Sequence, residues 1–503
     1  MAKGFLSRAV SLGFWTLLLR VGSTAFGVWL SNAVGAEGTG LYQLVLSVYM
    51  LAVTFSTSGV TIAVTRIVSE YYIQNNEAGM RRAFCLGLTF AASLGTLASL
   101  LLYVLSPFAA QYWLCDLRAA VPLRIFSFGL PFLSSASVIR GYFLGRQRTF
   151  LSVSGDVVEQ IVTAAITAPL VLLWRENGIE GICTAMVIGS VSAEILSCIY
   201  AALTCLSVRT KKAGIPPRGI GRRILSITFP VAVGNNVRAL LTAAENILTP
   251  AGLRKYGADS AGALAQYGVV KGMVWPILFL PTVLLSPVSS LLVPEISAAD
   301  AMHDTARVQS MTHRCLKAAL LYAFGAAGII WTFAPQACAL LFPEAENAAF
   351  YLRLLCPLIP LLYLDQIVDS ILKGLDQQKA SMRYNMADAA MRVALVFLLV
   401  PRYGIFGWIF MLYAGTIFNA SLSAMRLIKV SRVVIDVKSW VIRPVAAIVF
   451  SCTLASAIPV NAAVSAAGAL LCYIGFLYLS TRRKAQLRRF PFQKKCKKNE
   501  KSA

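Results

Sequence analysis

The sequence of 503 residues has few charged residues for its length. Charged residues make up 14% of the chain, hydrophobic residues make up 57%, and the mean hydropathy is +0.69. A water-soluble fold could not cover so much apolar surface. Apolar stretches of about 20 residues, long enough to cross a hydrocarbon core of about 30 Å, follow one another along the chain. The composition therefore predicts an all-helical protein that crosses the membrane many times.

Motifs for catalysis and for metal or cofactor binding are also missing. The chain has only two histidines, its eleven cysteines form no CxxC pair, and it has no G-x-x-x-x-G-K-[ST] loop for nucleotide phosphates. The loops predicted on the outer side are too short to fold into a catalytic domain. We therefore predict a transporter without a metal or cofactor rather than an enzyme.

Acidic residues are scarce: there are 22, against 46 lysines and arginines, which leaves a net charge of +24. The basic residues gather in alternate loops, with six in the segment 207–223 and ten between Arg482 and Lys501. Such an alternation marks cytoplasmic loops. It argues against nucleic-acid binding, because no soluble basic domain is present. It also predicts that both termini are cytoplasmic.

The hydropathy pattern and the loop charges together predict about fourteen membrane spans. The predicted spans lie near 10–33, 41–65, 83–105, 121–145, 155–174, 181–206, 224–249, 263–293, 316–342, 351–374, 384–400, 404–428, 440–458 and 460–480.

The chain contains an internal repeat. The segment Leu123–Gly145 resembles Leu352–Gly374 at a constant offset of 229 residues (352 − 123 and 374 − 145). The two copies are the fourth and tenth spans, which run in the same direction across the membrane, so the halves are expected to be parallel repeats around a central cavity. The predicted domains are a first lobe at 1–206, a basic linker at 207–223, a second lobe at 224–430, two further spans at 431–480 and a basic tail at 481–503.

Charged side chains inside spans 1, 7 and 8 indicate an anion site. Arg20, Arg238 and Lys271 lie within these spans, and Glu245 is the one carboxylate among them. A charge at this depth usually faces a cavity or a partner, and an excess of cations in a cavity attracts anions. The alternatives are that Arg238 pairs with Glu245 and that Arg20 extends to the interface. The residues predicted to bind a phosphate-containing headgroup are Arg20, Lys271, Arg238, Asn235, Asn236 and Glu245.

Two other groups of charges have a structural explanation. Asp388 and Arg392 are four residues apart and are expected to pair on one helix face. Arg140 is expected to reach the start of the next span, at Asp156 or Glu159.

Asp365 and Asp369 are also four residues apart, and their like charges should repel. They could pair with Lys373 or a neighbouring helix, or they could form a cation or proton site. We therefore list Asp365, Asp369 and Arg140 as candidates for coupling-ion binding or gating.

The eighth span contains four prolines, Pro276, Pro281, Pro287 and Pro294. Each proline removes a backbone donor and disturbs the helix. Within a membrane this is tolerated where neighbouring helices or a water-filled cavity satisfy the freed carbonyls. We expect this span to be bent.

Several local motifs resemble one known family. They are GAEGTGLYQL, ALAQYGVVKGM, LVPEIS, GYFLGRQR and ILKGLDQQK. They are similar to motifs of the stage V sporulation protein B family and its polysaccharide-exporter relatives. That family lies in the superfamily that contains lipid II flippases, O-antigen-type flippases and multidrug-and-toxin extruders. The resemblance covers roughly residues 1–480.

The resemblance implies a fourteen-helix, two-lobe carrier that moves undecaprenyl-pyrophosphate-linked glycans by alternating access. In lipid II flippases, cationic residues of spans 1, 2 and 8 contact the pyrophosphate, and Arg20 and Lys271 fall at matching places here. Span 2 has no basic residue before Arg66, and we infer that Arg238 compensates from span 7. In that branch the last two helices form a groove for the lipid tail.

The leading hypothesis is a flippase in the cell membrane that moves a polyprenyl-pyrophosphate-linked glycan, a cell-wall or spore-cortex precursor, from the inner to the outer leaflet. Its partners would be the lipid-linked glycan, membrane lipids and envelope or spore-cortex synthesis enzymes. One alternative is a cation-coupled multidrug exporter of the same fold, with Asp365, Asp369 and Glu245 as its acidic residues. Another is a membrane scaffold for envelope or spore-coat assembly.

Overall fold

The computed structural model describes residues 2–57, 59–207, 219–345, 347–433, 436–456 and 464–475. Within these ranges the chain is helical apart from short turns, and eleven helices are long and apolar enough to cross a membrane. The prediction of an all-helical, multi-pass membrane protein is confirmed, while the total of fourteen spans stays a prediction. The α-helices are α1 Ala2–Thr57, α2 Val60–Ile73, α3 Glu77–Phe108, α4 Ala120–Gly145, α5 Thr149–Leu173, α6 Gly178–Ser207, α7 Ile220–Tyr256, α8 Ser260–Gly268, α9 Trp275–Phe279, α10 Leu285–Ala301, α11 Thr305–Leu341, α12 Ala348–Leu355, α13 Ile359–Gly374, α14 Gln378–Ser431 and α15 Arg443–Ser456.

The two longest helices, α1 with 56 residues and α14 with 54, each bend at a glycine. Gly35 interrupts α1 with φ 78° and ψ 174°, and Gly404 interrupts α14 with φ 58° and ψ −135°. Only glycine adopts such angles without steric cost. The two kinks fall where the sequence predicts the boundaries between spans 1 and 2 and between spans 11 and 12.

The proline-rich eighth span is broken, as predicted. Helix α8 continues into a π-helical turn at Val269–Val274, then α9, a 3₁₀ turn at Leu280–Leu284 and α10. Proline cannot donate the i→i−4 hydrogen bond, and its ring needs space in the preceding turn. The changes of helix type therefore follow from the proline positions.

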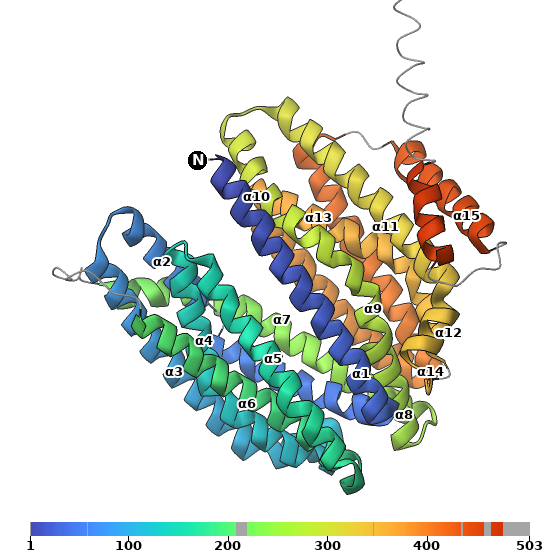
Figure 1. The fold of residues 1–503 in the computed structure, drawn as a ribbon, viewed down its shortest axis with the longest axis horizontal. Coiled ribbons are helices and arrows are strands. Elements are labelled where there is room, and N and C mark those ends of the chain that lie inside the picture. Colours follow the sequence, from blue (N-terminus) through green and yellow to red (C-terminus); the bar gives the residue numbers. More distant parts are fainter. Residues whose placement is uncertain are drawn as a thin grey trace, which may run out of the picture. The chain divides into compact units, whose positions relative to one another are not determined.

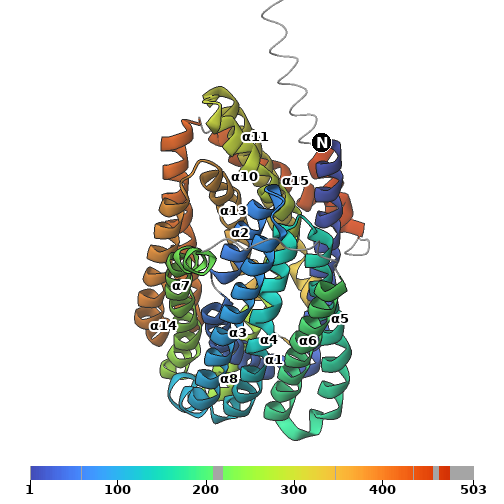
Figure 2. The same ribbon diagram turned by 90° about the vertical axis from the view of Figure 1, so that its left-hand side faces the viewer.

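The helices form two compact units. The first contains Met1–Pro287, Leu341–Ala348 and Lys379–Asn419, and the second contains Val288–Leu340, Ala349–Gln378 and Ala420–Ala503. In the first unit, α3, α4, α5 and α6 lie side by side, and α2 packs on α4 (Figures 1 and 2). The lobe limits predicted from the sequence stay a prediction.

The two copies of the repeat make a matching glycine contact, each within its own unit. A Cβ on Gly145 would lie 2.9 Å from the carbonyl oxygen of Thr65, and a Cβ on Gly374 would lie 3.0 Å from that of Val293. The partners are 228 residues apart (293 − 65), almost the offset of the repeat itself. Small residues at helix contacts allow the backbones of two helices to approach closely in membranes. Both copies of the repeat therefore pack against a neighbouring helix at the corresponding glycine.

Candidate functional site

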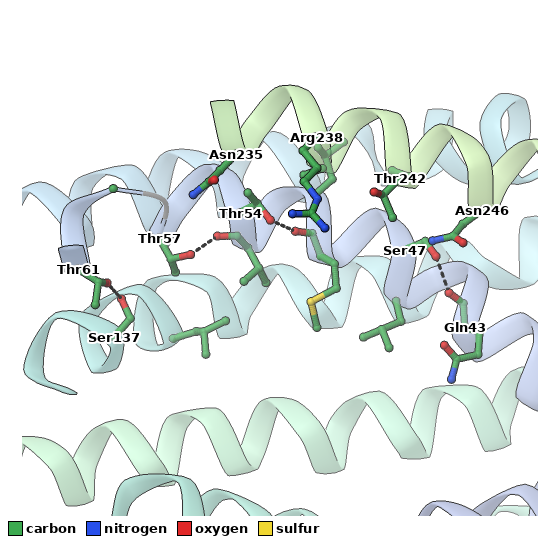
Figure 3. A pocket seen from close by; sticks show the side chains of 18 of the residues that line it. Gln43, Ser47, Thr54, Thr57, Thr61, Ser137, Asn235, Arg238, Thr242 and Asn246 are labelled. Carbon is green, nitrogen blue, oxygen red and sulfur yellow. Dashed lines mark hydrogen bonds between the residues drawn. The ribbon is translucent and has the colours of Figure 1, made fainter. Parts of the chain in front are cut away.

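The first unit contains a cavity of about 800 Å³ (Figure 3). Its walls come from α1 after the Gly35 kink, from α2, α4 and α7, and from the π-helical turn that holds Lys271. This volume lies within the range of roughly 300–1,000 Å³ that is usual for small-molecule sites. The polar and charged lining residues are Gln43, Ser47, Thr54, Thr57, Thr61, Ser137, Asn235, Arg238, Thr242, Asn246 and Lys271.

Two glycines bring the chain segments of the cavity together. A Cβ on Gly268 would lie 2.1 Å from the carbonyl oxygen of Ala36, and a Cβ on Gly40 would lie 2.0 Å from that of Leu264. The backbones of α1 and α8 are therefore in direct contact, as is common where small residues meet in membranes. The contact places Lys271, about one turn beyond Gly268, in the cavity wall.

The Lys271 ammonium is held by an aromatic ring. Its Nζ lies 5.6 Å from the centroid of the Trp275 ring, which is within the range of a cation–π interaction. Among the described residues, no carboxylate lies within 4.0 Å of it. The lysine is therefore in direct contact with an aromatic ring and not with a described carboxylate.

Arg238 is exposed to the cavity. Figure 3 shows Asn235, Arg238 and Thr242 along α7, on the side that faces the hydroxyl-bearing part of α1. In the described part of the chain Arg238 forms no ion pair within 4.0 Å. Glu245 does not line the cavity, and no ion pair joins it to Arg238 within 4.0 Å among the described residues.

Hydroxyl groups on α1 complete the wall. Ser47 donates to the Gln43 carbonyl, and Thr54 donates to the Met50 carbonyl, each at 2.8 Å. A hydroxyl whose hydrogen is used in this way still offers lone pairs, while the Gln43 and Asn235 amides offer donors. Among the described residues that line the cavity there is no aspartate or glutamate. The lining therefore suits an anion that carries hydroxyl groups.

The structure brings together three of the six predicted headgroup residues: Arg238, Lys271 and Asn235. Arg20 is exposed on the part of α1 before the kink and does not line the cavity. Asn236 donates to the Ala232 carbonyl at 2.8 Å on its own helix. The roles of all six in binding stay predictions.

Two of the three candidates for ion coupling or gating, Asp369 and Arg140, are engaged in ion pairs. Asp369 pairs with Lys373 at 2.6 Å, which was one of the alternatives given for it above. Asp369 and Asp365 both lie on α13. Arg140 pairs with Asp156 and with Glu159, the latter at 3.6 Å. These contacts favour a structural role for Arg140.

A second structural pair is also formed as predicted. Arg392 contacts Asp388 on α14 at 2.9 Å, and both side chains are largely buried. The pairing confirms that spacing of four residues joins these charges on one helix face.

The polar stripe on α1 is the feature that the sequence prediction missed. Its members Gln43, Ser47, Thr54 and Thr57 are separated by four, seven and three residues. Such spacing places them on one helical face. This spacing can be read from the sequence, but neutral polar residues within a span indicate a binding site less clearly than charged residues do.

Comparison with known proteins shows a family and a fold. Residues 14–299 match the family model described as polysaccharide biosynthesis protein. The chain is 24% identical over 423 residues to stage V sporulation protein B of Bacillus subtilis, which covers 82% of this chain and 81% of that protein. It is 26% identical over 188 residues, 35% of each chain, to the lipid II flippase MurJ of Bacillus subtilis.

Two solved structures have a similar fold at low sequence identity. The structure of lipid II flippase MurJ in an inward closed conformation aligns with a TM-score of 0.73 and 12% identity, covering 95% of this chain and 100% of that one. An inward-facing multidrug resistance transporter of the MATE family aligns with a TM-score of 0.68 and 14% identity, covering 84% and 99%. Both likenesses concern the fold alone.

Proposed function

Since the chain belongs to the polysaccharide biosynthesis protein family, we propose that it moves a polyprenyl-pyrophosphate-linked glycan from the inner to the outer leaflet. Its fold is that of the superfamily that includes lipid II flippases and multidrug extruders. The proposal makes it a transporter rather than an enzyme, with both termini in the cytoplasm. The basic loops between alternate spans support that orientation.

One observation carries the proposal: in the described part of the chain, Arg238 and Lys271 line a cavity of the first unit and no carboxylate lines it. The Arg238 guanidinium suits bidentate hydrogen bonding to phosphate oxygens, and the Lys271 ammonium acts as a point charge. A cavity with low-dielectric walls strengthens their attraction for an anion. A pyrophosphate provides the negative charge that this pair lacks.

The rest of the wall supports a sugar attached to the phosphates. The hydroxyls of α1 and the amides of Asn235 and Asn246 offer neutral donors and acceptors. Sugar hydroxyls pair with such groups, while the polyprenyl chain would stay in the lipid. Enzymes of envelope or spore-cortex synthesis would supply and consume this lipid.

The lining of the cavity argues against export of cationic drugs. Such a substrate would face Arg238 and Lys271 without a carboxylate to balance them, and like charges in a low-dielectric site repel strongly. A scaffold for envelope assembly would have no use for unpaired cations in a cavity, since each is costly to keep within the membrane.

Headgroup movement in proteoliposomes tests the proposal. The purified protein is reconstituted with a fluorescent polyprenyl-pyrophosphate-linked sugar, and the labelled headgroup is followed with an impermeant quencher. Lys271→Gln should slow the movement by about tenfold or more, because a charge-assisted contact is lost. Lys255→Gln, an exposed lysine at the end of α7 that does not line the cavity, is the matched control and should behave as wild type.

Equal rates for wild type and Lys271→Gln would contradict the headgroup role of the cavity. Movement of a cationic dye at the same rate as the lipid-linked sugar would favour the drug-export alternative.

A further inference from the structure

A buried carboxyl group lies outside the headgroup cavity and has no part in the proposed binding. Glu194 sits near the middle of α6 and is 7% exposed. Its two oxygens lie 2.6 and 2.7 Å from the hydroxyl oxygen of Tyr49 on α1. Within the described ranges, no lysine, arginine or histidine lies within 4.0 Å of the carboxyl group.

The surrounding helices are shaped to hold this group. A Cβ on Gly129 of α4 would lie 2.0 Å from Glu194 Oε2 and 3.3 Å from the Tyr49 hydroxyl. The Tyr49 ring stacks on Phe126, with centroids 4.0 Å apart. Helices α1, α4 and α6 thus meet at the carboxyl group of Glu194. Because Gly129 has no side chain, there is room for this group between them.

The charged groups nearby do not neutralise Glu194. Arg140 of α4 is engaged with Asp156 and Glu159 of α5. On α1 the neighbouring Tyr42 lies 3.4 Å from Ser190. A carboxylate in such a position lacks an opposite charge, which is costly in a low-dielectric interior.

The hydrogen bonds suit both protonation states. As a carboxylate, Glu194 accepts the one Tyr49 hydroxyl hydrogen, which can serve only one of the two oxygens. As a neutral acid, Glu194 donates its own hydrogen to the Tyr49 oxygen, and no buried charge remains. Exchange of one proton therefore requires only that Tyr49 change from donor to acceptor.

The same helices form the wall of the headgroup cavity. Tyr49 directly precedes Met50, and Gly129 lies one turn before Leu133; Met50 and Leu133 both line the cavity. A change in the Glu194–Tyr49 contact is thus positioned to alter how α1 and α4 pack beside the cavity. We propose that Glu194, with Tyr49, is a proton-binding site whose occupancy is coupled to headgroup movement. The coupling rests on the proposed function, whereas the proton site itself does not.

Infrared difference spectroscopy tests the proton site without any transport. Spectra of the purified protein in acidic and alkaline buffer should contain the carbonyl band of a protonated carboxylic acid. Glu194→Gln, which keeps a hydrogen-bonding group of the same shape, should remove that band. Glu180→Gln, an exposed glutamate at the start of the same helix, should retain it. A wild-type spectrum without a band that depends on Glu194 would overturn the proposal.

Proteoliposomes with an imposed pH gradient test the coupling. The gradient should change the initial rate of lipid-linked sugar movement in the wild type, and Glu194→Gln should lose about tenfold or more of the gradient-driven rate. Binding of the headgroup should be unchanged in this variant. An equal response of variant and wild type would overturn the coupling. If the wild type shows the infrared band but does not move the lipid, the proton site stands and the proposed flippase function fails.

Discussion

Replacement of Arg238 by glutamine is the sharpest perturbation of the cavity. The guanidinium is exposed to the cavity, and in the described chain no carboxylate lies within ion-pairing distance. Its loss therefore leaves no buried carboxylate unpaired. Arg238→Gln should weaken phosphate binding and leave the folding stability nearly unchanged.

The magnitude follows from the kind of contact that is lost. A hydrogen bond to a charged group contributes about 1.5–3 kcal/mol, and each 1.4 kcal/mol corresponds to about a tenfold change in Kd. Affinity for a pyrophosphate lipid should thus fall by roughly ten- to 150-fold. Substitutions at surfaces without buried partners usually change stability by within about 0.5 kcal/mol, so Tm should stay almost constant.

The assay compares two lipids that have the same polyprenyl chain, one with and one without a pyrophosphate group. Undecaprenyl pyrophosphate and uncharged undecaprenol are titrated into the detergent-solubilised protein, and binding is followed by tryptophan fluorescence. The variant should lose affinity for the pyrophosphate lipid and not for the alcohol. Arg66→Gln is the matched control, because Arg66 is exposed, pairs with Glu70 and does not line the cavity.

Three results would refute this reasoning. Unchanged affinity for undecaprenyl pyrophosphate would remove Arg238 from the phosphate site. An equal loss of affinity for both lipids would show that the variant perturbs the lipid tail instead. A large fall in Tm would show that the guanidinium has a structural partner.

Two further predictions concern stability, measured as Tm of the solubilised protein. Gly268→Ala should lower Tm, because its Cβ would lie 2.1 Å from the carbonyl oxygen of Ala36 and overpacking costs about 1–3 kcal/mol; Gly155→Ala, with no neighbour closer than 3.8 Å, should not, and equal effects would contradict the close helix contact. Arg392→Gln should cost about 3–5 kcal/mol, because it leaves Asp388, 9% exposed, without its partner. Adding Asp388→Asn should recover most of that loss, and a double variant no more stable than the single one would be inconsistent with a structural ion pair.

The all-helical, multi-pass fold could be predicted from the sequence because its signals are local. Span length, hydropathy and proline position depend on neighbouring residues, so the sequence predicted the bent eighth span and the span boundaries at which the Gly35 and Gly404 kinks lie, although not the kinks themselves. Pairs four residues apart, such as Asp388 with Arg392, are equally local. These predictions needed only the geometry of one helix.

The candidate site was predicted only in part because it depends on contacts between distant segments. Arg20 and Lys271 are both cations within apolar spans, and nothing local distinguishes them. The contact of Gly40 with α8 brings Lys271 into the cavity wall, while Arg20 lies on the other side of the kink at Gly35. Depth in the membrane can be estimated from sequence, but the direction in which a side chain faces cannot.

Pairing separates the charges that hold the first unit together from those available to a ligand. Arg146 pairs with Glu77 at 3.1 Å, and Arg118 pairs with Asp116 at 2.7 Å, so each of these arginines is neutralised locally. Arg238 and Lys271 have no such partner in the described chain, yet both line the same cavity. Unpaired charge is costly within a membrane, and a protein without use for it would be expected to replace it by neutral residues. A bound anion is the partner that would offset this cost, so the pairing pattern supports the proposal of an anionic headgroup in this cavity.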